Sequence, residues 1–301
     1  MINIMQLKAK IKNISKEKNI SAQLVLQNYM MERFIERIAL SDFQDQMIIK
    51  GGLLISSIVG LDSRATMDID MTLKGKPVNE VFILDYINEI SRININDEVK
   101  FDVVSITEIR EMDDYFGFRV SLIAGIGTMK IPLKIDITTG DKIIPSEISY
   151  EYTLMFENRS IKIKAYNLET ILSEKIETII SRGNQNTRMR DFYDVYILLK
   201  LKSKNIDYNI LRLAIEETSQ KRDSLNLLLK YKEIISNIEN NNEMLVRWEN
   251  YRNSFNYART IDFNEICKLL TEILEEIDIK WFFKIQITIF IELLNKDVPK
   301  I

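Results

Sequence analysis

The chain has 301 residues, of which 46% are hydrophobic and 28% charged, and it carries a net charge of −3 with no histidine and one cysteine. This balance indicates a folded, cytoplasmic protein. It excludes a disordered chain, a protein that coats nucleic acid by bulk charge, histidine-based catalysis and an intrachain disulfide. The N-terminus is too polar for a signal peptide, and the apolar run at 281–294 is too short and too polar for a membrane span.

Helical and strand patterns alternate in the first half of the chain. Ser21 is expected to cap a helix whose apolar residues recur at helical spacing as far as Ile38. Gly51 and Gly52 then precede a short apolar helix, and a strand with regular alternation follows at 66–73. Further elements are expected as a helix over 78–93, strands over 99–106, 116–123 and 129–138, and a hairpin over 152–165 that turns at 157–158.

The second half of the chain has a different pattern. From residue 168 onward the apolar spacing is helical almost to the end. Strands that cluster in the first half and helices in the second predict an α+β chain. We therefore expect an α/β domain with a mixed sheet and N-terminal helices over 1–165, and a mostly helical domain over 166–301.

The strand at 66–73 carries two carboxylates on one face. Side chains alternate along a strand, so Thr66, Asp68, Asp70 and Thr72 share one face, and Met67, Ile69, Met71 and Leu73 are expected to face the core. Adjacent carboxylates repel each other unless a cation lies between them, and Mg²⁺ prefers such all-oxygen ligands. The alternative is a solvated strand face with a chance pair of acids.

The strand at 129–138 repeats this arrangement. Its isoleucines alternate inward, so Asp136 shares the opposite face with Lys134 and Thr138. Asp136 is expected to join Asp68 and Asp70 in a cluster that holds one or two Mg²⁺ ions, which would clamp a triphosphate and activate a hydroxyl. The alternative is a surface aspartate near the end of a strand.

Two features ahead of the acidic strand suit an anion. Gly51 and Gly52 open a short helix, where backbone N–H groups and the helix N-terminus favour negative charge, although a Gly-Gly pair is often a plain turn. Arg64 lies in the loop directly before the acidic strand. These residues are candidate triphosphate contacts.

A lysine and two aspartates face inward on the later helices. Lys175 lies within the apolar stripe of its helix, where a lysine either snorkels to solvent or reaches an anion in a cleft. Asp191 and Asp194 are three residues apart on the next helix and share a face. Since buried charges need partners, an ion pair between Lys175 and one of these aspartates is expected at a cleft wall.

The loop between these two helices concentrates positive charge. Arg182, Arg188 and Arg190 lie there beside Gly183 and several amides. Such a loop suits contact with phosphate or an RNA backbone, and an ordinary solvated loop is the alternative.

The motifs together, in this order, resemble a known family. The run KGGLLISSIVGLDSRATMDID at 50–70 resembles the signature of the AbiEii-type abortive-infection toxins, which belong to the nucleotidyltransferase superfamily with a polymerase-β-like core. The stretch at 169–199 looks like that family's Glu-Lys and Arg-Asp-x-x-Asp helices, and KIDITTGD matches the position of its third acid. The regions at 30–52 and 247–258 are similar too, whereas the tail at 278–301 matches nothing in the family.

The resemblance implies a role for each candidate residue. The nucleotide would contact Lys50, Gly51, Gly52, Arg64 and Thr66; metal would bind Asp68, Asp70 and Asp136; and the catalytic set would be Asp68, Asp70, Lys175, Asp191 and Asp194. Either Asp191 or Asp194 would complete the active site with Lys175. Many superfamily members carry Gly-Ser where this chain has Gly51-Gly52, and Gly-Gly is usual in the AbiEii branch.

The resemblance also implies an activity and partners. The reaction would be Mg²⁺-dependent transfer of a nucleoside monophosphate from an NTP to RNA, such as the 3′ end of tRNA, with release of pyrophosphate. This would block translation as part of a toxin–antitoxin or phage-defence system. The partner would be an antitoxin encoded nearby, expected to be a winged-helix protein. Transfer to a small molecule or a protein, and nucleotide binding without catalysis, are the alternatives. The sequence leaves open the NTP, the tRNA and the oligomeric state.

Overall fold

The computed structural model describes residues 4–76, 79–110 and 116–277. It divides the chain into two compact units, Met1–Asn167 and Leu168–Ile301. All the described strands lie in the first unit, and the described part of the second is built from helices and turns. No helix in the described ranges combines the length and hydropathy that a bilayer crossing requires. The expected apolar run at 281–294 and the tail at 278–301 lie outside the described residues.

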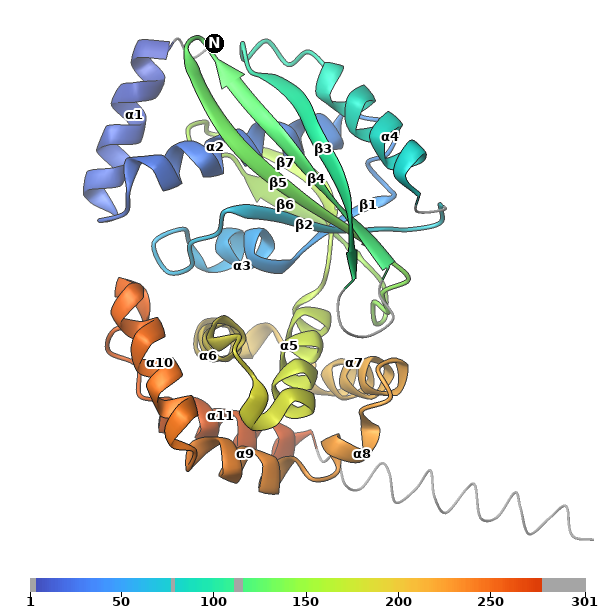
Figure 1. Ribbon diagram of the computed structural model, residues 1–301, viewed down its shortest axis with the longest axis vertical. Coiled ribbons are helices and arrows are strands. Elements are labelled where there is room, and N and C mark those ends of the chain that lie inside the picture. The colour runs from blue at the N-terminus through green and yellow to red at the C-terminus, as the bar shows by residue number, and fades with distance from the viewer. Residues whose placement is uncertain (1–3, 77–78, 111–115, 278–301) are drawn as a thin grey trace, which may run out of the picture. The chain divides into compact units, whose positions relative to one another are not determined.

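A seven-stranded mixed sheet forms the centre of the first unit (Figure 1). Its strand order is β3-β4-β5-β2-β1-β7-β6, so strands far apart in sequence become neighbours. β2 runs parallel to β5 and antiparallel to β1, and β1 runs parallel to β7. The strands are β1 (Met47–Lys50), β2 (Asp68–Leu73), β3 (Lys100–Arg110), β4 (Phe116–Ile126), β5 (Met129–Thr139), β6 (Ile148–Thr153) and β7 (Ser160–Ala165).

Four helices surround this sheet: α1 (Ile4–Glu17), α2 (Ala22–Ala39), α3 (Gly51–Val59) and α4 (Glu80–Arg92). The hydroxyl of Ser21 accepts a hydrogen bond from the Leu24 N–H at 3.1 Å, which confirms the expected cap of α2. α2 packs against β5 and β7, α3 against β1 and β2, and α4 against β3. Figure 1 shows α2 crossing the sheet. The α3 contact brings a helix N-terminus to the strand that bears the aspartate pair.

The structure confirms the α+β class and most expected elements, and it corrects three points. Met67 lies before β2 and is 50% exposed, so it does not face the core as predicted. The sequence reasoning missed α1, an amphipathic helix near the N-terminus, and β1. β1 has only four residues, and its pairing with β2 and β7 makes it a strand. The apolar run of β1 is too short to show the alternation of a strand or the spacing of a helix, so its pattern does not predict a strand.

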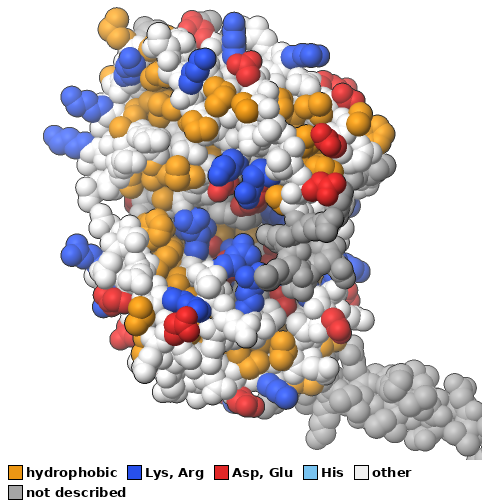
Figure 2. Space-filling view, in the orientation of Figure 1, with side chains coloured by type: hydrophobic (Ala, Val, Ile, Leu, Met, Phe, Trp, Pro, Cys, Tyr) orange, Lys and Arg blue, Asp and Glu red, His pale blue; other side chains and the backbone are white. Residues whose placement is uncertain are grey.

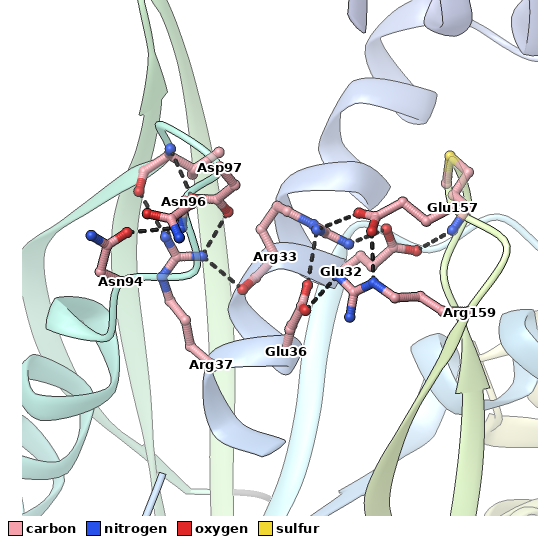
Figure 3. A network of polar contacts seen from close by, with 11 residues as sticks. Glu32, Arg33, Glu36, Arg37, Asn94, Asn96, Asp97, Glu157 and Arg159 are labelled. Carbon is pink, nitrogen blue, oxygen red and sulfur yellow. Dashed lines mark hydrogen bonds and ion pairs between the residues drawn. The ribbon is translucent and has the colours of Figure 1, made fainter. Parts of the chain in front are cut away.

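Charged side chains are buried along α2 (Figure 3). Arg33 forms ion pairs with Glu32 at 2.8 Å and with Glu157, in the β6–β7 turn, at 2.9 Å. Arg37 donates to both carboxylate oxygens of Asp97, at 2.8 and 2.7 Å. Buried charges are tolerated when paired in this way. The network therefore ties a hairpin turn and the segment before β3 to α2.

The second unit consists of α5 (Leu168–Arg182), α6 (Met189–Lys202), α7 (Tyr208–Lys221), α8 (Leu225–Leu228), α9 (Tyr231–Glu239), α10 (Asn242–Ser254) and α11 (Phe263–Glu276). α5 packs against α6 and α7, and α11 packs against α6 and α9. The α5–α6 contact places the two helices that carry the predicted lysine and acid pair side by side. Aromatic side chains, including Trp248 and Phe263, whose ring centroids are 5.7 Å apart, fill the space between α6, α10 and α11.

Candidate active site

Four charged residues form one row across the centre of the sheet. Strand pairing sets Lys50 opposite Asp70, Asp70 opposite Asp136, and Asp136 opposite Arg119. Residues that pair directly point to the same face of a sheet. The register therefore confirms the expectation that Asp136 lies beside the aspartates of the acidic strand. Asp68 lies two positions earlier on the same face, opposite Lys134.

Arg119 binds the third carboxylate of this group. Its Nε donates to Asp136 Oδ1 at 2.7 Å, and its Nη2 donates to Asp136 Oδ2 at 2.6 Å. The hydrogen bonds to Asp136 raise the pKa of Arg119, and the charges of Asp68 and Asp70 act in the same direction. One guanidinium is thus held within the field of three carboxylates. The sequence reasoning missed Arg119, because nothing in β4 itself indicates its partner.

The paired glycines let α3 approach the acidic strand. Gly51 has a φ of +64°, and a Cβ placed there would lie 2.0 Å from Asp70 Oδ2. The N–H of Gly52 donates to that same oxygen at 3.1 Å. A Cβ at Gly52 would lie 2.7 Å from the hydroxyl of Thr66. The glycines are therefore required for close packing, and a carboxylate already lies at the helix N-terminus, where negative charge is favoured.

Lys50 is anchored by a buried acid that the sequence reasoning did not single out. Lys50 Nζ donates to Asp141 Oδ2 at 2.6 Å and to the Thr138 hydroxyl at 2.8 Å, and the Tyr166 hydroxyl donates to the same Asp141 oxygen at 2.7 Å. Burial alone would raise the pKa of Asp141, but the charge and hydrogen bond of Lys50 lower it below its usual value. Contact between Lys50 and a triphosphate stays a prediction.

Arg64 and Thr66 are buried next to the glycine pair. Arg64 is 2% exposed, and its Nη1 donates to the Ala65 carbonyl at 2.5 Å. The side chain of Asn28 on α2 donates to the Thr66 carbonyl at 3.1 Å. This hydrogen bond therefore also fixes the segment before β2 to α2. Contact of Arg64 and Thr66 with the nucleotide likewise stays a prediction.

In the second unit, the expected lysine–aspartate ion pair is present. Lys175 Nζ lies 2.5 Å from Asp191 Oδ1 and 3.2 Å from Asp194 Oδ2. The side chain of Asp191 is 4% exposed and that of Asp194 is fully buried. One cation thus bridges two buried acids, which confirms the shared helical face of the pair. Asp191 is the more accessible of the two to a substrate.

The basic loop of the second unit lies beside aromatic rings. Arg188 and Arg190 are exposed, and Arg182 is partly exposed. The Arg190 guanidinium lies 5.7 Å from the centroid of the Phe255 ring. That half-buried ring lies 4.8 Å from the ring of Tyr251, measured between centroids. Arginine and aromatic groups together suit a nucleic acid better than a basic loop alone.

The carboxylates of β2 and β5 are ligands of the kind that Mg²⁺ prefers, but that of Asp136 is already bonded to Arg119. Hard oxygen ligands are what Mg²⁺ prefers, and Asp68 and Asp70 supply them from one face of β2. Across the described ranges, no three acidic, histidine or cysteine side chains are arranged to hold a metal ion. Both oxygens of Asp136 are bonded to Arg119. A metal at Asp68 and Asp70 would gain Asp136 as a ligand only if that carboxylate released Arg119.

Comparison with known proteins gives one family and several similar structures. The family described as nucleotidyl transferase AbiEii toxin, type IV toxin–antitoxin system, matches residues 33–271. JHP933 from Helicobacter pylori is 16% identical, with a TM-score of 0.47, over 91% of this chain and 99% of that chain. MenT4, a nucleotidyltransferase toxin from Mycobacterium tuberculosis H37Rv, is 12% identical, with a TM-score of 0.49, over 90% and 98% of the two chains. A search of curated proteins finds no match.

Proposed function

Since the chain belongs to the AbiEii family of nucleotidyltransferase toxins, we propose that it transfers a nucleoside monophosphate from an NTP to the 3′ end of a tRNA. The observation that carries this proposal is the row of carboxylates on β2 and β5, which meets the N-terminus of α3 at Asp70. Carboxylates beside a glycine-rich helix start suit a metal-bound triphosphate. The modified tRNA could no longer be used in translation, which would make the protein toxic.

Different residues of the chain would have different roles in this reaction. The acceptor hydroxyl forms a bond to the α-phosphorus while the bond to the pyrophosphate oxygen breaks, and the hydroxyl proton passes to a carboxylate of the row. Asp68 and Asp70 would hold Mg²⁺, which supplies positive charge to the phosphates when it is bound. Lys175, which forms ion pairs with Asp191 and Asp194, would serve the same reaction, as the family resemblance implies.

The second unit supports an RNA acceptor. Acidic and basic side chains are interspersed on the face drawn in Figure 2, so contact with RNA would depend on local groups rather than on bulk charge. Arg188 and Arg190 are exposed, and Phe255 offers a ring for stacking next to Arg190. Single-stranded RNA is bound by arginine contacts to phosphate and by aromatic rings that stack on bases. The free 3′ end of a tRNA has this single-stranded character.

The family implies an antitoxin partner, because it is described as part of a type IV toxin–antitoxin system. We propose that this antitoxin is a winged-helix protein encoded nearby. We also propose that the toxin acts in the cytoplasm and has a role in phage defence. Co-expression with the neighbouring gene should restore growth that the toxin alone arrests.

A transfer assay tests the proposed activity. The protein is incubated with each labelled NTP in turn, Mg²⁺ and total tRNA, and we expect label at tRNA 3′ ends. Asp70→Asn should abolish the transfer. Asp102→Asn, which changes an exposed aspartate on β3 of the same unit, should leave it intact. Absence of label from every RNA, or equal transfer by Asp70→Asn, would refute the proposal.

The same assay separates the alternatives. Label on protein or on a small molecule, but not on RNA, would favour a different acceptor within the same chemistry. NTP binding that persists in EDTA and in Asp70→Asn, without any transfer, would instead favour a protein that binds nucleotide without catalysis.

A further inference from the structure

Arg119 occupies the place of a cation in the row of carboxylates. We propose that Arg119 is an internal counter-ion that competes with a divalent cation for Asp136 and its neighbours, and so lowers the cation affinity of the free protein. The inference rests on the proposed metal site. It concerns a residue on β4 to which neither the sequence motifs nor the family description gives a role.

The contact geometry commits Asp136 to Arg119. The two hydrogen bonds of 2.7 and 2.6 Å join Nε and Nη2 to the two separate oxygens of Asp136. This is the bidentate arrangement in which the planar guanidinium matches a carboxylate best. The two residues are also direct partners in the β4–β5 register, so their backbones hold the side chains together. Asp136 can ligate a metal only after at least one of these bonds is broken.

The surrounding charges explain why this competition affects the whole site. Arg119 feels the negative charge of Asp68 and Asp70 in addition to that of Asp136. At the other end of the row, Lys50 is bonded to the buried Asp141. The loss of the guanidinium charge would leave three neighbouring carboxylates more negative toward any other cation. Attraction between charges a few ångströms apart, even when partly screened, amounts to about a tenfold change in affinity or more.

Arg119 can leave without unfolding its surroundings. Its side chain is 41% exposed, whereas that of Asp136 is 18% exposed. The guanidinium therefore exchanges the carboxylate for water without a large desolvation cost. An incoming triphosphate also brings negative charge that the displaced guanidinium can face. Cation and NTP should therefore bind cooperatively to the wild-type protein, and this coupling should weaken when a neutral residue replaces Arg119.

The test is cation binding to the full-length protein in the absence of NTP and RNA. Mn²⁺ serves as the probe, and the free ion is followed by electron paramagnetic resonance. We expect Arg119→Gln to bind Mn²⁺ about tenfold more tightly than wild type. Arg119→Lys keeps the charge but cannot form the bidentate contact, so its Mn²⁺ affinity should lie between those of wild type and Arg119→Gln. Thermal melting of each variant shows that the fold is retained.

Lys134→Gln is the matched control. Lys134 lies on β5 two residues before Asp136, on the same face, with an exposed side chain opposite Asp68. The Lys134→Gln substitution removes the same single charge opposite Asp68 but leaves the contact between Arg119 and Asp136 intact, so it should raise Mn²⁺ affinity clearly less than Arg119→Gln does. An equal increase in Arg119→Gln and Lys134→Gln, or no increase in Arg119→Gln, would overturn the inference.

The outcome is independent of the proposed function. If RNA labelling works and depends on Asp70 while Arg119→Gln leaves Mn²⁺ affinity unchanged, the inference fails and the function stands. If Arg119→Gln raises Mn²⁺ affinity and no NTP yields label on RNA, the inference stands and the function fails.

Discussion

Replacement of Gly51 by alanine tests why the glycine pair precedes the acidic strand. The φ of +64° costs an alanine about 1 kcal/mol. The new Cβ would lie 2.0 Å from Asp70 Oδ2 and 2.6 Å from Asp70 Cβ, so the carboxylate must move away from α3 and the local backbone must shift with it. That movement gives up the hydrogen bond from the Gly52 N–H, worth about 2 kcal/mol because the acceptor is charged. Gly51→Ala is therefore expected to lower the free energy of unfolding by at least about 3 kcal/mol.

Gly75 provides the matched control for this experiment. It has a φ of +72°, and a Cβ there would meet no described atom within 4 Å. Gly75→Ala should therefore show the backbone cost alone, about 1 kcal/mol. Urea unfolding followed by circular dichroism measures both variants. Equal destabilisation by the two substitutions would refute the steric argument. So would a Gly51→Ala protein whose loss is not relieved when Asp70 is also changed to glycine.

Three further predictions concern the second unit. Lys175→Met removes the cation that Asp191 and Asp194 share, while Asp191 keeps a 3.5 Å ion pair with Arg188, and should lower the free energy of unfolding in urea by about 3 kcal/mol. Lys200→Met, which breaks an exposed pair, should be near neutral, and equal effects of the two substitutions would contradict this. Burial raises the pKa of Glu216 from 4.5 to about 7, so the folded state holds a proton that the unfolded state has lost, and stability should fall as pH rises between these values. Glu216→Gln should reduce the fall in melting temperature between pH 5 and 7, and an unchanged slope would refute the assignment. Arg190→Gln and Phe255→Ala should each weaken tRNA binding about tenfold in fluorescence anisotropy, and unaltered affinity in both would exclude this surface.

Local periodicity made much of the candidate site predictable. The alternation along a strand is a property of the backbone, so the parity of Asp70 and Asp136 could be inferred before their strands were placed. Helical spacing likewise placed Asp191 and Asp194 on one face of α6 and Lys175 on the apolar face of α5, and the packing of the two helices in the structure forms the ion pair between them. Such relations hold within one element, where the sequence separation alone determines which side chains share a face.

Tertiary structure decided what lies between elements. Lys50, Asp70, Asp136 and Arg119 form one row only because the strand order brings β1, β2, β5 and β4 together in this register. No spacing along the chain encodes that register. The same is true of the contact between Asp70 and the α3 glycines. The sequence by itself thus determined the pair of acids, since neighbours on one strand share a face. Only the packed sheet determined that Arg119 is held among them, because that contact depends on how separate strands align.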